Sequence, residues 1–257
     1  MFVSPLHTEA QQGHSSPESF ETLYLQLRKK EKRIYSDDEV KNLPSIRPSD
    51  PHYKEWLLRK KTSERLIKYL LKKNRPLNIL ETGCGNGWLS ARMAKTIPGS
   101  VMGIDINKEE LRQAARVFSK VPNLVFIAAD MYSGQLNHKH FDIIVFAASL
   151  QYFSSAAEIL QSALQFVKPG GEIHIIDTVF YPTDSIGAAQ RRTEDYYTQL
   201  GFPEAAAYYF HHCLEDLDNF ETKILYNPRS WLHQFSKKKN PFYWLCIPKL
   251  VDEKGNP

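Results

Sequence analysis

The sequence predicts an α/β protein built on a doubly wound, mostly parallel sheet. Between residues 76 and 178, five apolar strand-like runs alternate with helical patterns. This is the order expected of parallel strands joined by right-handed crossovers. The first run, residues 78–82, breaks into the glycine-rich stretch 83–87 and then into a helical pattern. A strand, a tight glycine turn and a helix start in that order are typical of the first unit of such a sheet.

Two helical patterns precede the first strand. Apolar residues recur at three- and four-residue spacings from Pro17, and a second pattern runs from about His52 to Lys73, after a loop broken by three prolines. Residues 1–17 are polar and rich in Ser, Gln, His and Pro, so we expect them to be disordered. We therefore divide the chain into this disordered N-terminus, an N-terminal helical cap over 18–75 and a main domain over 76–257.

The second half of the main domain is predicted to complete the sheet. Residues 169–171, Pro-Gly-Gly, mark the last turn from helix to strand, and the strand follows over 172–179. A helix is expected over 186–201, within a helical and aromatic insertion at about 181–215. The runs 221–226 and 242–247 predict an antiparallel pair that brings the sheet to seven strands.

Composition excludes several classes of protein. With 257 residues and 42% hydrophobic content, the chain can bury one sizeable core, and its formal net charge is only +4. The basic clusters 28–30, 59–61 and 237–239 lie beside acids or on helical faces. We interpret them as solvated surface and expect no nucleic-acid partner.

Cysteine usage and hydropathy indicate a cytoplasmic protein without a membrane partner. The three cysteines are widely spaced and suggest neither a metal site nor a disulfide framework. No window approaches the ~18–20 apolar residues that span a bilayer. Cys84 stands near a helix N-terminus, where a thiolate would be favoured, but a small residue in a tight loop needs no such chemistry. We expect no metal, and either a monomer or a homodimer.

The glycine-rich loop predicts a site for a nucleotide-like ligand. Gly83 and Gly85 can adopt positive φ and let a ligand lie against the main chain, and Gly87 lets the next helix pack close to the strand. A dinucleotide site has the spacing Gly-x-Gly-x-x-Gly. Here the third glycine comes one residue early, and Trp88 occupies its place. This spacing disfavours a nicotinamide cofactor.

Acids follow the next two apolar runs. Asp105 ends the second run, where a carboxylate can accept hydrogen bonds from ribose hydroxyls. It could instead cap the helix expected over 108–119, but Asn107 can do that. Asp130 and Met131 end the third run. The carboxylate could accept from an adenine amino group, and the polarizable thioether could cover the purine face.

These motifs together resemble those of class I S-adenosylmethionine-dependent methyltransferases, most closely the small-molecule branch called type 11. The likeness covers about residues 75–180 and rests on 81–87, Asp105, 130–131, 141–146 and 167–173. It implies a Rossmann-like fold for a methyltransferase domain over 76–257 and S-adenosyl-L-methionine as cofactor. The cofactor-binding residues that it implies are Glu81, Gly83, Cys84, Gly85, Asn86 and Gly87 at the amino acid end, Asp105 with Ile106 at the ribose, Asp130 and Met131 at the adenine, and Ala147 in the segment 147–152 along the methyl-transfer face.

The resemblance predicts methyl transfer to an O, N or C atom of a small or medium-sized acceptor. Such a displacement can be accelerated mainly by positioning, so we assign no catalytic residue. If the acceptor must lose a proton, the candidates near the expected mouth of the site are Tyr152, His211 and His212, together with His138 and His140. The aromatic-rich stretch 196–244 could form an acceptor pocket or could be ordinary core and lid packing.

Three alternatives stay open at this stage. An RNA or protein methyltransferase is disfavoured because base-methylating enzymes typically carry an Asn-Pro-Pro-Tyr-like element where residues 147–150 read Ala-Ala-Ser-Leu. A non-catalytic module that binds S-adenosylmethionine would keep the same glycine loop and acids. A nicotinamide oxidoreductase would share the fold, and fold alone does not exclude it.

Overall fold

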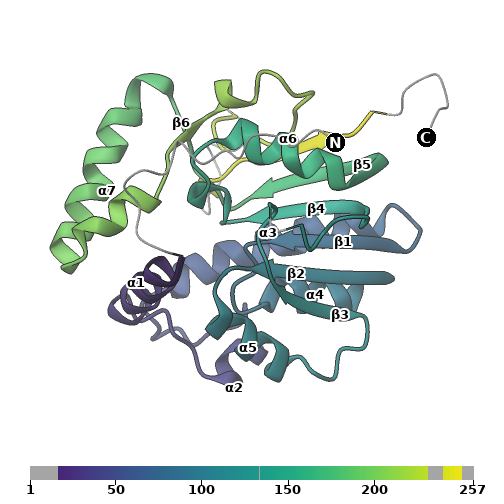
Figure 1. Ribbon diagram of the computed structural model, residues 1–257, viewed down its shortest axis with the longest axis horizontal. Coiled ribbons are helices and arrows are strands. Elements are labelled where there is room, and N and C mark those ends of the chain that lie inside the picture. Colours follow the sequence, from purple (N-terminus) through teal and green to yellow (C-terminus); the bar gives the residue numbers. More distant parts are fainter. Residues whose placement is uncertain (1–16, 133, 231–239, 251–257) are drawn as a thin grey trace, which may run out of the picture.

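The computed structural model describes residues 17–132, 134–230 and 240–250, so the N-terminus expected to be disordered lies outside the described residues except for Pro17. Its centre is a seven-stranded sheet of order β3-β2-β1-β4-β5-β9-β8 (Figure 1). Strands β1 to β5 are parallel, whereas β9 is antiparallel to both β5 and β8. The predicted fold class is confirmed. The strands are β1 (Leu77–Thr82), β2 (Gly99–Asp105), β3 (Leu124–Ala128), β4 (Phe141–Ala147), β5 (Val167–Ile176), β8 (Lys223–Tyr226) and β9 (Trp244–Pro248).

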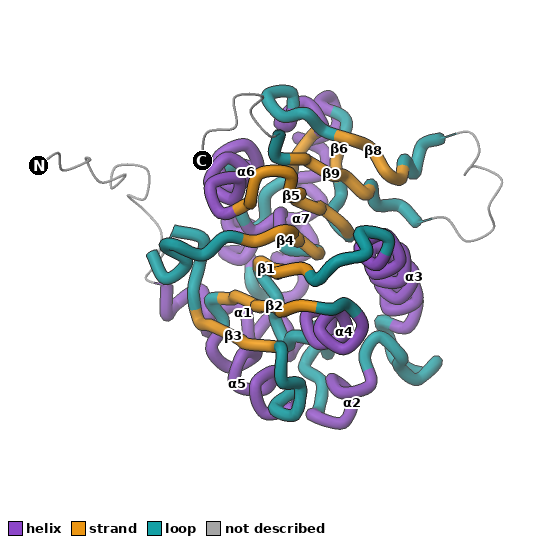
Figure 2. Tube along the Cα trace, turned by 90° about the vertical axis from the view of Figure 1, so that its right-hand side faces the viewer, coloured by secondary structure: helices purple, strands orange, loops and turns teal. Residues whose placement is uncertain are grey.

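Helices cover both faces of the sheet (Figure 2). On one face α3 (Tyr53–Leu71) and α4 (Trp88–Thr96) bury Leu66, Leu70, Leu89 and Met93 against alternate residues of β1, β2 and β4. On the other face α6 (Ala156–Phe166) packs on the opposite residues of the same strands. Helix α5 (Lys108–Val117) contacts β3. Because both faces are covered, the middle of each central strand is apolar on both sides, as in residues 79–80 of β1 and 143–146 of β4.

The connection between β3 and β4 differs from the prediction that a helix follows every strand. The described residues of this connection form turns. The stretch 137–140, Asn-His-Lys-His, is exposed and offers no apolar stripe for a helix to bury. Within the described part of the connection, Leu136 differs from these exposed residues, because its side chain is buried in the same hydrophobic cluster as α6.

Strand β5 begins earlier than predicted. It starts at Val167, directly after α6, and includes the Pro-Gly-Gly stretch that was expected to be a turn. The register with β4 shifts between Phe141 and Ile143, which accommodates this irregular start. A Cβ on Gly171 would lie 2.7 Å from the Asp142 carbonyl oxygen. The glycine therefore permits the close approach of β5 to β4.

Two segments that are far apart in the sequence meet beside the sheet. Helix α1 (Pro17–Lys30) lies next to α7 (Ile186–Leu200) (Figure 1), and Leu27 of α1 packs against Tyr197 of α7 and Ala205. Around α7 lie the short strands β6 (Phe180–Tyr181) and β7 (His212–Cys213), which pair in parallel, and the 3₁₀ turns η2 (Thr183–Ser185), η3 (Pro203–Tyr208) and η4 (Leu214–Leu217). The remaining elements are α2 (Asp37–Asn42) and η1 (Leu150–Tyr152).

The part of the chain that the structure describes contains no helix with both the length and the apolar character needed to span a membrane.

Asp142 of β4 ties the N-terminal edge of the sheet together. Its carboxylate accepts from the Asn78 N–H at 2.8 Å, from Arg75 at 2.7 Å and from Lys168 at 2.9 Å. Burial by itself would raise the pKa of this carboxyl, but these donors hold it below its usual value of 3.8. The stabilisation is therefore present above that value and is lost as the pH falls below it.

We predict that Asp142→Asn lowers the free energy of unfolding by about 1–3 kcal/mol at pH 7. The difference from the unsubstituted protein should shrink at pH 3, and urea denaturation at both values measures it. Asp184→Asn, at an exposed position in η2, is the control and should change little. An equal effect of Asp142→Asn at both pH values would contradict this role.

Candidate functional site

The site lies where the strand order reverses. From β1 the chain continues to β2 on one side, and from β4 it continues to β5 on the other. Ligands of open α/β sheets bind in the crevice at the carboxyl ends of two such strands. A cavity of about 420 Å³ is found there, within the usual size range of small-molecule sites. Of the residues that the resemblance implies, those lining it are Glu81, Gly83, Cys84, Gly85, Asn86, Asp105, Ile106, Asp130 and Ala147.

Glycine at position 83 lets the ends of β1 and β4 come together. Gly83 has φ +70°, and a Cβ there would lie 2.5 Å from the Ser149 Cβ. The Ser149 hydroxyl donates to the Thr82 carbonyl at 2.7 Å and fixes this contact. Any larger residue at position 83 would be strained and would push the two strand ends apart.

Gly87 serves packing and does not line the cavity. It has φ +73° and precedes α4, and a Cβ there would lie 2.4 Å from the Phe126 ring. Because glycine has no Cβ, the start of α4 can lie close to β3. The structure thus places Gly87 in the packing position that the spacing predicted.

Asp105 anchors the glycine loop. Its carboxylate accepts from the Gly85 N–H and from the Asn107 N–H, both at 2.8 Å. Asn107 caps α5 by accepting from the N–H groups of Glu109 and Glu110, so capping does not fall to Asp105. Burial raises the pKa of Asp105, although the two backbone hydrogen bonds oppose the rise.

Glu81 is a buried acid on the floor of the cavity. It is 2% exposed, and the Ser90 hydroxyl donates a short hydrogen bond to its carboxylate. Burial raises the pKa of Glu81 to about 8, and the hydrogen bonds from Ser90 only partly offset this. Glu81 therefore carries a proton at neutral pH as long as no cation lies beside it.

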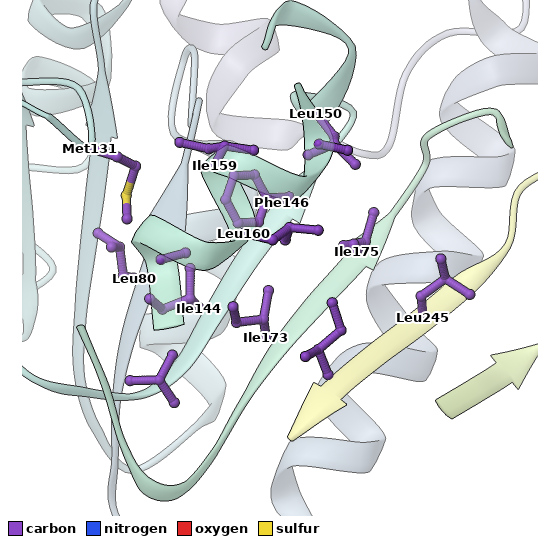
Figure 3. Close-up of a cluster of buried hydrophobic side chains, with 14 of the residues drawn as sticks. Leu80, Met131, Ile144, Phe146, Leu150, Ile159, Leu160, Ile173, Ile175 and Leu245 are labelled. Carbon is purple, nitrogen blue, oxygen red and sulfur yellow. The ribbon is translucent and has the colours of Figure 1, made fainter. Parts of the chain in front are cut away.

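The structure separates the two residues expected at the adenine. Asp130 lines the cavity, and its carboxylate accepts from the Tyr132 N–H at 2.8 Å. Met131 is 3% exposed and lies beside Leu80 in the core below the sheet end (Figure 3). Its sulfur accepts from the Thr82 hydroxyl at 3.5 Å. The chain turns at Asp130 and directs the apolar thioether inward, so the expectation that Met131 covers a purine is wrong for its side chain.

Of the candidate bases, Tyr152 alone lines the cavity. Burial raises the pKa of its phenol, against the opposing charge of Arg28, so it is a poor base at neutral pH. His211 hydrogen-bonds to Thr193 at 2.9 Å, and His212 is buried with Nε2 3.1 Å from the Leu150 carbonyl. His138 and His140 are exposed in the β3–β4 connection and do not reach the cavity.

The sequence predicted an N-terminal helical cap but did not show which of its residues form a wall of the cavity. Glu21, Tyr24 and Arg28 of α1, Tyr35, and Trp56 and Arg59 of α3 all line it, as does Arg33. The clusters 28–30 and 59–61 were expected to be solvated surface. This is wrong for the first residue of each. The four-residue spacing from Tyr24 to Arg28 and the three-residue spacing from Trp56 to Arg59 place each arginine on the inward face of its helix.

Two of the three arginines in the cavity wall are paired. Arg33 donates to both oxygens of Glu55, at 3.1 and 2.7 Å, and Arg59 donates to the same carboxylate at 3.0 Å. Burial would raise the pKa of Glu55, but these two guanidinium groups lower it to about 2. Burial also raises the pKa of the Cys84 thiol well above its usual range, which favours a packing role for Cys84.

Comparison with known proteins agrees with this geometry. Residues 79–171, which run from the first strand through the glycine loop to the start of β5, match the protein family described as a methyltransferase domain. The match includes Glu81, Asp105 and Asp130.

Curated relatives match the same part of the chain. A malonyl-[acyl-carrier protein] O-methyltransferase of Halalkalibacterium halodurans is 31% identical over 123 residues, which cover 44% of this chain and 45% of the relative. A ubiquinone biosynthesis O-methyltransferase of Hydrogenovibrio crunogenus is 37% identical over 98 residues, which cover 36% of this chain and 39% of the relative. The matched part of the chain thus spans less than half the length of these relatives.

A solved structure extends the likeness of the fold to nearly the whole chain. The magnesium protoporphyrin IX methyltransferase of Synechocystis PCC 6803, crystallised with bound SAH, superposes with a TM-score of 0.60 at 15% identity. The superposition covers 91% of this chain and 97% of that one. Residues 79–171 are thus similar to a methyltransferase domain, and the fold around them is that of a solved methyltransferase.

Proposed function

We propose that this protein binds S-adenosyl-L-methionine in the cavity and transfers its methyl group to a small or medium-sized acceptor. One observation carries the proposal: the glycine loop and the carboxylates of Glu81, Asp105 and Asp130 line one cavity at the carboxyl ends of the parallel strands. These donors and acceptors match an amino acid, a ribose and a purine amino group in turn. The volume of about 420 Å³ also suits a ligand of this size.

This match between side chains and parts of the cofactor suggests a role for each residue. Glu81 faces the ammonium group of the amino acid end, since a buried carboxylate without a cation is unfavourable. Asp105 accepts from the ribose hydroxyls while it holds the Gly85 N–H. Asp130 accepts from the adenine amino group, and Ala147 lies along the face where the methyl group is presented.

In this proposal the protein accelerates methyl transfer mainly by positioning the acceptor relative to the cofactor. The cofactor supplies an activated methyl group, and orientation of a bound acceptor in line with it can lower the barrier by up to ~7–11 kcal/mol. Tyr24, Trp56 and Tyr152 give the acceptor side of the cavity an aromatic lining. These residues orient an acceptor and exclude water, and no side chain is assigned as general base.

The N-terminal helices complete the site in this proposal. Tyr24 of α1 makes an edge contact with Tyr152 of η1, with ring centroids 6.0 Å apart, and Glu21 accepts from the Lys108 N–H at the start of α5 at 2.8 Å. Residues 18–75 thus act as a cap on the domain formed by 76–257, and 181–215 as an insertion beside it. From composition we further propose a cytoplasmic monomer or homodimer that does not bind nucleic acid.

The test of the proposed function is calorimetry followed by methyl transfer. We expect S-adenosylmethionine and S-adenosylhomocysteine to bind with measurable heat and NAD to give none. Label from a tritiated methyl group should then enter a metabolite extract. Absence of heat with both sulfur ligands would refute cofactor binding, and binding without label transfer would instead indicate a non-catalytic module.

Asp105→Ala should weaken the binding of S-adenosylhomocysteine about 10- to 100-fold, as expected for the loss of a charge-assisted hydrogen bond. The loss should be similar for 5′-methylthioadenosine, because the carboxylate faces the nucleoside. Glu109→Ala, at an exposed position in the first turn of α5, is the matched control and should bind normally. Unchanged affinity in Asp105→Ala would remove this residue from the site.

Binding of S-adenosylhomocysteine should release a proton from Glu81. The groups that act on Glu81 are Ser90, Asp105 and Arg59, and its pKa in the free protein is about 8. A ligand ammonium favours the ionised carboxylate, so affinity should rise between pH 6 and pH 8, by up to about tenfold per unit.

Titrations in buffers of different ionisation enthalpy measure the released proton directly. Glu81→Gln should abolish the release. The control ligand 5′-methylthioadenosine lacks the ammonium group and should show no such linkage. A pH-independent affinity for S-adenosylhomocysteine would refute the assignment of Glu81.

A further inference from the structure

Arg28 is a charged group in the cavity wall that forms no ion pair with any of the residues that the structure describes. It lies on α1 and lines the cavity, and its Nε is buried without a hydrogen-bond acceptor. Within the described residues, no carboxylate oxygen lies within 4.0 Å of its guanidinium. Arg33 and Arg59 differ from it, because both bind Glu55.

The Arg28 side chain is half-buried, and a buried guanidinium N–H without an acceptor is unfavourable. The Tyr24 ring, whose centroid lies 5.2 Å from the guanidinium carbon, compensates it only in part. An anion that enters the cavity would satisfy both the charge and the open Nε. The planar fork of Arg matches a carboxylate with two parallel hydrogen bonds.

The acids nearby limit the charge of this anion. Glu110 and Asp105 both line the cavity, and Glu110 acts electrostatically on Arg28. A dianion such as a phosphate would meet these acids, whereas one negative charge matches one guanidinium. The site therefore suits a monocarboxylate.

The surroundings of Arg28 point to the acceptor as the carrier of this carboxylate. Arg28 lies over Tyr24, Tyr24 contacts Tyr152, and the Tyr152 ring contacts Tyr209 at 6.1 Å. Tyr152 ends the segment 147–152 that is proposed to face the transferred methyl group. Arg59 differs from Arg28 in that its charge acts on Glu81, where the amino acid of the cofactor is proposed to lie.

We propose that Arg28 binds the carboxylate of an acceptor whose apolar body packs on Tyr24 and Tyr152. This inference rests on the proposed function and specifies its acceptor class. In this arrangement the Arg28 guanidinium neutralises the carboxylate of the acceptor. The aromatic or aliphatic part of the acceptor packs against the aromatic rings on the same side of the cavity.

The experiment compares carboxylic acids with their amides on the full chain saturated with S-adenosylhomocysteine. The probes are benzoate and benzamide, trans-cinnamate and cinnamamide, and hexanoate and hexanamide. At least one acid should bind about 10- to 100-fold more tightly than its amide. Arg28→Gln should abolish this preference, and Arg28→Lys should keep part of it. Lys29→Gln, at the next and exposed position of α1, should leave it intact.

Three results would overturn the proposal. The first is an unsubstituted protein that prefers no acid, a result that depends on no variant and on no question of folding. The second is an Arg28→Gln protein that still prefers acids. The third is an Arg28→Gln protein that loses affinity for S-adenosylhomocysteine but not for 5′-methylthioadenosine, which lacks the carboxylate, since the partner of Arg28 would then be the cofactor.

Failure of the proposed function gives a different result. In that case S-adenosylhomocysteine itself does not bind the unsubstituted protein. Normal binding of this ligand with no preference among the acid and amide pairs refutes the role of Arg28 alone.

Discussion

The hydrogen bond from the Gly85 N–H to the Asp105 carboxylate is the interaction on which the site depends. It joins the loop after β1 to the end of β2, and it keeps the main chain of residues 83–85 open toward the cavity. On the opposite side, the Ser149 hydroxyl holds the end of β1 against the end of β4. Two side chains thus fix one loop to both neighbouring strands, and a loop fixed in this way needs little reorganisation when a ligand binds.

The cavity brings together several ionisable side chains, and its walls come from distant parts of the chain. Glu81, Asp105 and Glu110 have raised pKa values because they are buried, and three arginines from the N-terminal region face them. Such groups are unfavourable inside a protein unless they have partners. Their presence in one cavity is therefore better explained by ligands than by stability, and Arg28 is the clearest example.

Local patterns were reliable where a motif and its surroundings lie together in the chain. The periodicity and the cap chemistry of the sequence predicted the seven strands, the antiparallel pair β8–β9, the helices near Pro17 and His52, and the capping of α5 by Asn107. Helix α2 was missed, although Ser36 and Glu39 form a capping box that the sequence displays. The connection from β3 to β4 was assigned by analogy with its neighbours, and its own polar composition argued otherwise.

By itself the sequence determined the sheet and the loop of the nucleotide-like site, because glycines, acids and apolar runs at fixed spacing act within a few residues of one another. Only the tertiary structure decided which way Met131 turns, that His211 and His212 lie away from the cavity, and that Arg28 and Arg59 face it. These outcomes depend on how α1, α3 and the α7 region pack onto the sheet. That packing is set by contacts between residues far apart in the chain, which no local spacing records.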